Sequence, residues 1–125
     1  IREIEFIMQA IQLIFGGKYV DIRERNCVKF FKTIKKYKFL SNKDVDFLIF
    51  AYKFLRNLEH KIQILHEKQT HSLPKNSNEL KIISYYFGFK NVNFFLEYQF
   101  NIRKEVHKIF NNFIMFKGLM LKSQN

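Results

Sequence analysis

The chain has 125 residues, of which 22 are Lys or Arg and 11 are Asp or Glu, so its formal net charge is +11. This length fits one domain, and 47% hydrophobic with 18% aromatic residues can form a core, which excludes a disordered basic tail. Basic residues interrupt every long apolar run and there is one cysteine, which excludes a membrane span and an internal disulfide framework.

The start of the chain bears on its cellular location and its completeness. The first residues contain no basic stretch followed by an uninterrupted apolar one, so we expect no secretory signal and a cytoplasmic protein. The chain opens with Ile1 and enters an amphipathic pattern at once. We therefore expect it to be a fragment of a larger polypeptide.

The first two predicted helices are amphipathic. Residues 2–15 place isoleucines at helical spacing with polar residues on the opposite side, and two glycines then stop the pattern. Residues 23–37 form the second predicted helix, with Cys27, Phe31 and Ile34 among the residues expected to be buried.

Two further predicted helices follow. Residues 43–68 are apolar on more than one side, which is typical of a central helix, and Ser41 and Asn42 supply cap chemistry at its start. Residues 77–87 carry a shorter pattern, which Gly88 closes.

The last predicted helix covers residues 92–116. No segment shows the strict alternation of apolar and polar residues that would predict a β-strand. The sequence therefore predicts an all-α fold, a bundle of about five helices. We expect one domain over residues 1–116 and a loose polar tail over residues 117–125.

Two residue groups resemble chemical sites, but their spacing argues against both. His60, His66 and His71 are separated by six and five residues, whereas two ligands on one helical face are four apart. Cys27 has no histidine within helical reach, so we expect a buried thiol rather than a nucleophile.

The pair Asp44 and Asp46 has the D-x-D spacing of two-metal nucleotidyl transfer. On a strand the two carboxylates would converge, but on a helix their directions differ by about 200°. We interpret these residues as favourable charge at a helix N-terminus. We therefore predict no catalytic residue and no metal ligand in this chain.

The alternative function is that of a basic, helical nucleic-acid-binding or protein-interaction module, and a lysine-rich segment favours the nucleic-acid-binding form. This segment contains Lys29, Lys32, Lys35, Lys36 and Lys38, three of which fall on one helical face. The competing explanation is codon drift, because Lys, Asn, Ile and Phe are all abundant while alanine occurs only twice. Arginines are scattered, whereas direct readers of bases concentrate them on one element, so we do not expect nucleic acid to be the partner.

Four motifs occur in the order found in one enzyme family. They are REIEFIMQ at residues 2–9, QLIFGG at residues 12–17, the adjoining pair AYKFLR and LEHKIQ, counted as one, within residues 51–63, and QTHSLP at residues 69–74. Together they resemble the glutamine synthetase adenylyltransferases, bifunctional bacterial enzymes of nitrogen metabolism that add AMP to a tyrosine of glutamine synthetase and remove it. The likeness is greater to the N-terminal, deadenylylating half, and Val20 and Lys68 depart from the family pattern.

The resemblance implies that this chain is the helical domain that follows the nucleotidyltransferase core. That core is missing here, so the resemblance implies no catalysis by the chain alone and no cofactor within it. Mg²⁺ and ATP or ADP are implied for the intact parent enzyme. The implied partners are glutamine synthetase, a PII-type signal protein and the core itself, and the helical domain would position one of these proteins.

The resemblance also carries over to individual positions. One group is implied at the junction with the core: Arg2, Glu3, Glu5 and Gln9. A second group is implied as a polar cluster in interdomain contact: Arg56, His60, Gln63, Gln69, Thr70 and His71. From the residues alone, two polar stripes on otherwise apolar helices are either solvated faces or buried or interfacial polar networks. The first stripe is Arg2, Glu5, Gln9 and Gln12, and the second is Arg56, His60, Gln63 and Glu67. We also expect apolar surface around Phe6 and Met8 to be left uncovered or covered by self-association.

Overall fold

The computed structural model describes residues 1–68 and 76–123, with side chains described for residues 1–66 and 78–115. Within this part the chain forms five α-helices, two short 3-10 helices and no strand, which confirms the predicted all-α bundle. The elements are α1 (Arg2–Phe15), η1 (Val20–Arg23), α2 (Cys27–Ile34), η2 (Lys35–Tyr37), α3 (Asn42–Lys68), α4 (Asn76–Tyr86) and α5 (Val92–Ser123).

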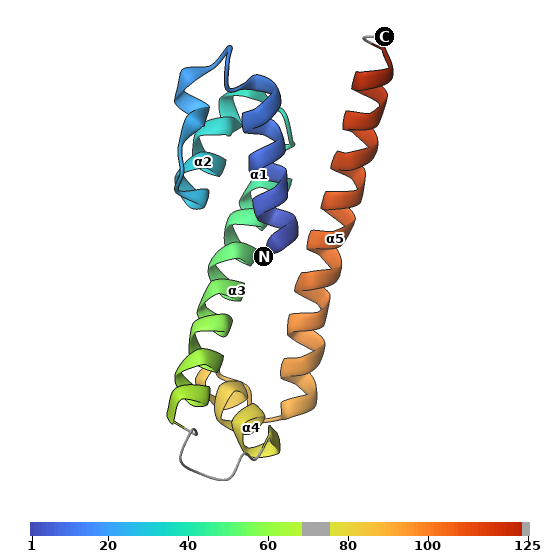
Figure 1. The fold of residues 1–125 in the computed structure, drawn as a ribbon. Coiled ribbons are helices and arrows are strands. Elements are labelled where there is room, and N and C mark those ends of the chain that lie inside the picture. The colour runs from blue at the N-terminus through green and yellow to red at the C-terminus, as the bar shows by residue number, and fades with distance from the viewer. Residues whose placement is uncertain (69–75, 124–125) are drawn as a thin grey trace.

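Figure 1 shows α3 and α5 as two long helices that run along the molecule, with α1 and α2 beside one half and α4 across the other end. Apolar side chains from all five α-helices form one core. Its most deeply buried members are Ile4, Ile7, Ile11, Ile22, Phe30, Phe31, Ile34, Val45, Leu48, Ala51 and Phe95. Each fully buried side chain of this kind stabilises the fold by about 1.5–3 kcal/mol.

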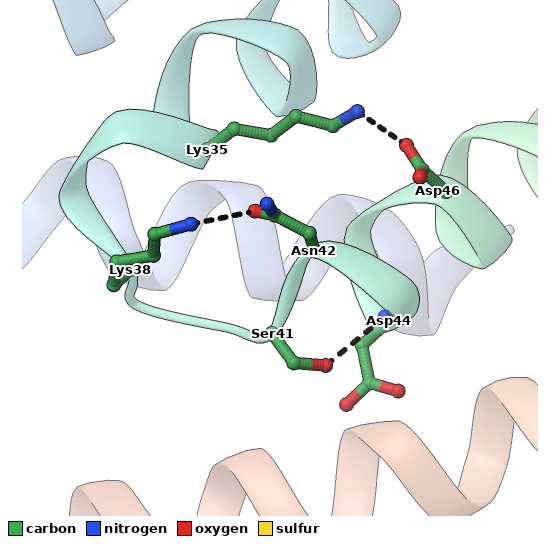
Figure 2. A network of polar contacts seen from close by, with 6 residues as sticks. All are labelled: Lys35, Lys38, Ser41, Asn42, Asp44 and Asp46. Atoms are coloured by element: carbon green, nitrogen blue, oxygen red, sulfur yellow. Dashed lines mark hydrogen bonds and ion pairs between the residues drawn. The ribbon is translucent and has the colours of Figure 1, made fainter.

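The predicted end of the first helix and the predicted start of the long third helix agree with the structure to within one residue. The first helix ends at Phe15, directly before Gly16. Ser41 caps α3, because its hydroxyl oxygen accepts a hydrogen bond of 3.1 Å from the backbone N–H of Asp44 (Figure 2). Such a cap satisfies a backbone donor that has no partner within the helix.

The single helix predicted over residues 23–37 is wrong, because three separate elements occupy this region. Asn26 interrupts the predicted helix. Its side-chain oxygen accepts a hydrogen bond from the backbone N–H of Lys29 at 3.0 Å, so α2 starts at Cys27. An asparagine in this role favours a cap over a helix interior. Helix α2 then tightens into η2 after Ile34.

The predicted tail also differs from the structure, because α5 continues past residue 116 to Ser123. Leu, Met and Lys are good helix formers, and the one glycine at position 118 costs only about 1 kcal/mol. No helix among the described residues is both long and apolar enough to cross a lipid bilayer.

A left-handed glycine ends α4, as predicted. Gly88 has φ 87°, its N–H donates to the Tyr85 carbonyl at 2.9 Å, and the Phe89 N–H donates to the Ser84 carbonyl at 2.9 Å. These two bonds are those of a Schellman motif, which satisfies carbonyls that the helix leaves unpaired. The motif fixes the direction in which the chain leaves α4 for α5.

Replacing Gly88 tests this turn. An L-residue in the left-handed region costs roughly 1–2 kcal/mol, so we expect Gly88→Ala to lower the free energy of unfolding by about 1 kcal/mol in urea denaturation followed by circular dichroism. The matched control is Gly17→Ala, because a Cβ there meets no atom within 4 Å and its φ is not positive. Equal effects of the two substitutions would contradict the assignment.

Candidate functional site

Two adjoining pockets lie between α3 and α5, next to the N-terminus of α1. The first has a volume of about 460 Å³ and is lined by Ile1, Arg2, Glu3, Leu55, Leu58, Glu59, Ile62, Gln63 and Arg103. The second has a volume of about 200 Å³ and is lined by Leu58, Ile62, Leu80, Ile83, Phe95, Leu96, Gln99 and Arg103. They share Leu58, Ile62 and Arg103, and we call the two together the α3/α5 groove.

Helix lengths explain why this groove exists. At 1.5 Å per residue, the 14 residues of α1 span about 21 Å, whereas the 27 residues of α3 span about 40 Å. Helix α1 therefore lies beside only one half of the long pair (Figure 1). Past the N-terminus of α1, helices α3 and α5 face each other across the groove. Helix α4 closes the end of the groove that lies away from α1.

The wall of the groove is apolar, and its mouth carries free polar groups. Arg2 is exposed and makes no hydrogen bond or ion pair with any described residue. The Nε of Arg103 donates to the Gln99 Oε1 at 2.7 Å, which leaves its two terminal nitrogens without a described partner. Gln63 is also exposed beside them. Two guanidinium groups and an amide suit a carboxylate or phosphate.

The two carboxylates of the groove are already engaged. Glu3 Oε2 lies 2.7 Å from Nδ1 of His107, whose Nε2 lies 3.1 Å from the Asn111 amide, so this contact ties α1 to α5. Glu59 Oε1 lies 3.6 Å from the Arg56 guanidinium. These exposed pairs add little stability, but they leave the arginines as the main free charges at the groove mouth.

The structure brings together three of the residues expected at a site. Arg2 and Glu3 come from the junction group and Gln63 from the polar cluster, and all three line the α3/α5 groove. Arg103 and His107 were not predicted from the sequence, because α5 reaches α1 only through the tertiary fold and no local spacing links these residues to α1.

The other expected residues lie elsewhere. Gln9 and His60 are exposed, and Glu5 is half-buried; none of them lines the groove. Arg56 packs against Tyr52, with its Nε 3.3 Å from the hydroxyl oxygen and its guanidinium carbon 5.7 Å from the ring centre. The expected residues Gln69, Thr70 and His71 lie outside the described residues.

The polar stripe of α1 contains one internal anchor. The Gln12 amide donates to the carbonyls of Ile22 at 3.0 Å and Glu24 at 2.6 Å. Arg23 donates from Nε to the Gly16 carbonyl at 2.7 Å. These bonds hold η1 against α1 around the buried Ile22. The polar-network interpretation is therefore confirmed for Gln12, whereas Gln9 on the same helix is exposed.

The lysine-rich segment does not form a continuous charged face. Lys35 pairs with Asp46 at 2.5 Å, Lys36 pairs with Asp21 at 2.5 Å, and Lys38 donates to the Asn42 side chain at 3.2 Å. The ammonium of Lys36 and then the Tyr37 hydroxyl lower the pKa of Asp21. These carboxylates reduce the field on which nucleic-acid binding depends.

The D-x-D pair is separated as its helical position predicts. Figure 2 shows the Asp46 carboxylate directed toward Lys35 and the Asp44 carboxylate directed away from it. Among the described residues, no three His, Cys, Asp or Glu side chains come together so that they could hold a metal ion.

Apolar surface on α1 is partly uncovered. The rings of Phe6 and Phe110 pack edge to face with their centres 5.5 Å apart, but Phe6 remains 47% exposed. Leu13 is 85% exposed. Met8, in contrast, is half-buried against the core. Burial of this helix is therefore incomplete, as expected, with more apolar surface exposed at Phe6 than at Met8.

Comparison with known proteins finds one matching family and relatives that align with most of the chain. The family model described as GlnD PII-uridylyltransferase matches residues 1–114. Relatives named bifunctional glutamine synthetase adenylyltransferase/adenylyl-removing enzyme are 37% identical over 91% of the chain in Methylococcus capsulatus and 40% identical over 77% in Bartonella henselae. The corresponding relative in Rhizobium meliloti is 41% identical over 73% of the chain.

These matches cover only a small part of each relative. The chain spans 12% of the Methylococcus capsulatus protein, 10% of that of Bartonella henselae and 9% of that of Rhizobium meliloti. No solved structure matches the chain.

The Gln12 anchor predicts unequal effects of two glutamine substitutions. Gln12→Ala leaves two carbonyls without their donor, so we expect the free energy of unfolding to fall by about 1–2 kcal/mol. Gln9→Ala, at an exposed position of the same helix, is expected to change it by less than about 0.5 kcal/mol. Urea denaturation measures both, and similar losses for the two variants would contradict the anchor.

Cys27 provides a test of the absence of a reactive thiol. It is buried, and this burial, followed by the charge of Glu5, raises the pKa of the Cys27 thiol to about 12. The thiolate is therefore scarce at pH 8, and we expect alkylation by iodoacetamide to be at least about a hundredfold slower in the native protein than in denaturant. Comparable rates would show that Cys27 is an accessible, activated thiol.

Proposed function

Because this chain belongs to the GlnD PII-uridylyltransferase family, we propose that it is a helical, non-catalytic domain of a glutamine synthetase adenylyltransferase/adenylyl-removing enzyme. Its role is to hold a protein partner in position for a nucleotidyltransferase core elsewhere in that enzyme. The observation that carries this proposal is the α3/α5 groove, where expected residues from α1 and α3 converge.

The chemistry of the groove suits protein binding. Its apolar wall, which includes Leu55, Leu58 and Ile62, can bury side chains of a partner. Its mouth presents Arg2 and Arg103, which can pair with acidic side chains and set the orientation of the bound segment. An apolar centre with a charged rim is the usual composition of a protein interface.

The described residues fit binding better than catalysis. Cys27 is buried, and the carboxylates of Asp44 and Asp46 diverge, so neither a nucleophile nor a magnesium site is assembled from them. We therefore assign Mg²⁺ and ATP or ADP to the core of the parent enzyme. The chain's own contribution is to bind and orient a protein.

Glutamine synthetase is the first candidate partner, because the relatives are named for their action on it. A PII-type protein is the second, because the matching family model is named for uridylyl transfer to PII. We favour glutamine synthetase, since all three curated relatives described above carry its name. We place this interaction in the cytoplasm.

Binding to glutamine synthetase is the direct test. Calorimetry of this chain with adenylylated and unmodified glutamine synthetase of Methylococcus capsulatus is expected to show saturable binding, with no AMP added or removed by the chain alone. Arg103→Ala removes a guanidinium whose two terminal nitrogens have no described partner, and we expect it to weaken binding about tenfold.

The matched control is Arg25→Ala, because Arg25 is exposed on the segment before α2 and does not line the groove. Circular dichroism of both variants checks that the fold is retained. Absence of binding to either form of glutamine synthetase, or equal weakening by the two arginine variants, would overturn the proposal.

A further inference from the structure

A separate pocket lies where α4 turns into α5, at the end of the molecule opposite α2 (Figure 1). It has a volume of about 620 Å³, which is within the range of ligand-binding sites. Its lining residues are Lys81, Ile82, Ser84, Tyr85, Phe89, Lys90, Asn91 and Val92. We call it the α4/α5 pocket, and it shares no residue with the α3/α5 groove.

The backbone fixes the shape of this pocket. The Schellman bonds at Gly88 hold Phe89 at a set position relative to Tyr85. Asn91 then caps the next helix, because its side-chain oxygen accepts from the backbone N–H of Asn93 at 2.7 Å. A pocket whose walls are ordered before binding costs less entropy to fill.

The rim of the pocket is positively charged. Lys81 and Lys90 are both exposed and neither has an ion-pair partner among the described residues. No acidic residue in the described part of the chain lines the pocket. The one carboxylate of α4, Glu79, lies 3.7 Å from His66 of α3 instead. An acidic ligand would therefore meet two cations and no opposing charge.

The surface of the pocket between the two lysines is mostly apolar and offers few hydrogen-bonding groups for a polar ligand. Tyr85 is 78% exposed and Ile82 is 53% exposed, while Phe89 and Val92 are half-buried. The buried Ser84 hydroxyl donates to the Leu80 carbonyl at 2.7 Å, so its proton is already used. A nucleotide base would leave its own polar edges unpaired here. An apolar side chain would leave no polar group unpaired in this pocket. Tyrosine is also frequent among the residues that contribute most to binding at protein interfaces.

We propose that the α4/α5 pocket docks an acidic segment of a partner protein, with an apolar side chain of that segment against Tyr85 and Phe89 and its carboxylates at Lys81 and Lys90. This surface is a second docking site, beyond the proposed role of the α3/α5 groove. It does not depend on that role, since the residues involved differ.

Two synthetic peptides test the proposal. The acidic probe is the capped hexapeptide Glu-Asp-Leu-Phe-Asp-Glu, and its neutral counterpart is Gln-Asn-Leu-Phe-Asn-Gln. Titration into the isotopically labelled chain at pH 7, followed by NMR, is expected to show saturable shifts at the amides of Tyr85, Phe89 and Lys90. The neutral peptide is expected to bind about tenfold more weakly, because it lacks the carboxylates.

Variants with matched controls locate the site. Tyr85→Ala and the double change Lys81→Glu with Lys90→Glu are each expected to weaken the acidic peptide by about tenfold or more. Phe94→Ala, at a 64% exposed aromatic outside the pocket, is expected to have no effect. The pair Lys29→Glu and Lys32→Glu alters net charge equally at exposed positions elsewhere and is also expected to leave binding unchanged.

Three outcomes would overturn the proposal. The first is no saturation of the acidic peptide up to about 1 mM, which corresponds to binding weaker than about 4 kcal/mol. The second is equal loss in the Lys29 and Lys32 variant, which would indicate general charge attraction. The third is tighter binding of AMP or single-stranded RNA than of the peptide at the same residues.

Discussion

A difference in helix length is the constraint on which the arrangement of this bundle depends. The isoleucines of α1 pack into the core, but α1 is about half as long as α3 and α5 and can cover only part of the space beside them. Past its N-terminus, apolar faces of α3 and α5 remain without a third helix between them. The α3/α5 groove follows from this mismatch, as does the position of Arg2 at its mouth.

The distribution of charge matters more than its total. The chain carries +11, yet the lysine-rich segment next to α3 is partly neutralised by Asp21 and Asp46. At the α3/α5 groove, Arg2 makes no ion pair with any described residue and Arg103 bonds only Gln99, through its Nε. At the rim of the α4/α5 pocket, Lys81 and Lys90 likewise make no ion pair with any described residue. A cation beside apolar surface can orient a bound partner by pairing with its carboxylates, while burial of apolar side chains supplies the attraction. This pattern favours acidic protein partners over nucleic acid.

The sequence predicted several local structures that a single residue decides. Gly16, Ser41 and Gly88 act within one turn of a helix, and their effects were predicted correctly. Asn26 was missed because helical periodicity runs across it, although its side chain forms a cap. The site was predicted only in part: Arg2, Glu3 and Gln63 belong to recognisable motifs, whereas Arg103 joins them through packing of α5 that no local spacing encodes.

We propose that glutamine synthetase binds in the α3/α5 groove. Hydrogen–deuterium exchange of this chain, with and without adenylylated glutamine synthetase, tests it most directly, because exchange reports protection along the whole backbone. We expect slower exchange in the complex at the start of α1, around residues 58–63 of α3 and around residues 99–103 of α5. Unchanged exchange at these three segments, or protection confined to residues 29–38, would contradict it.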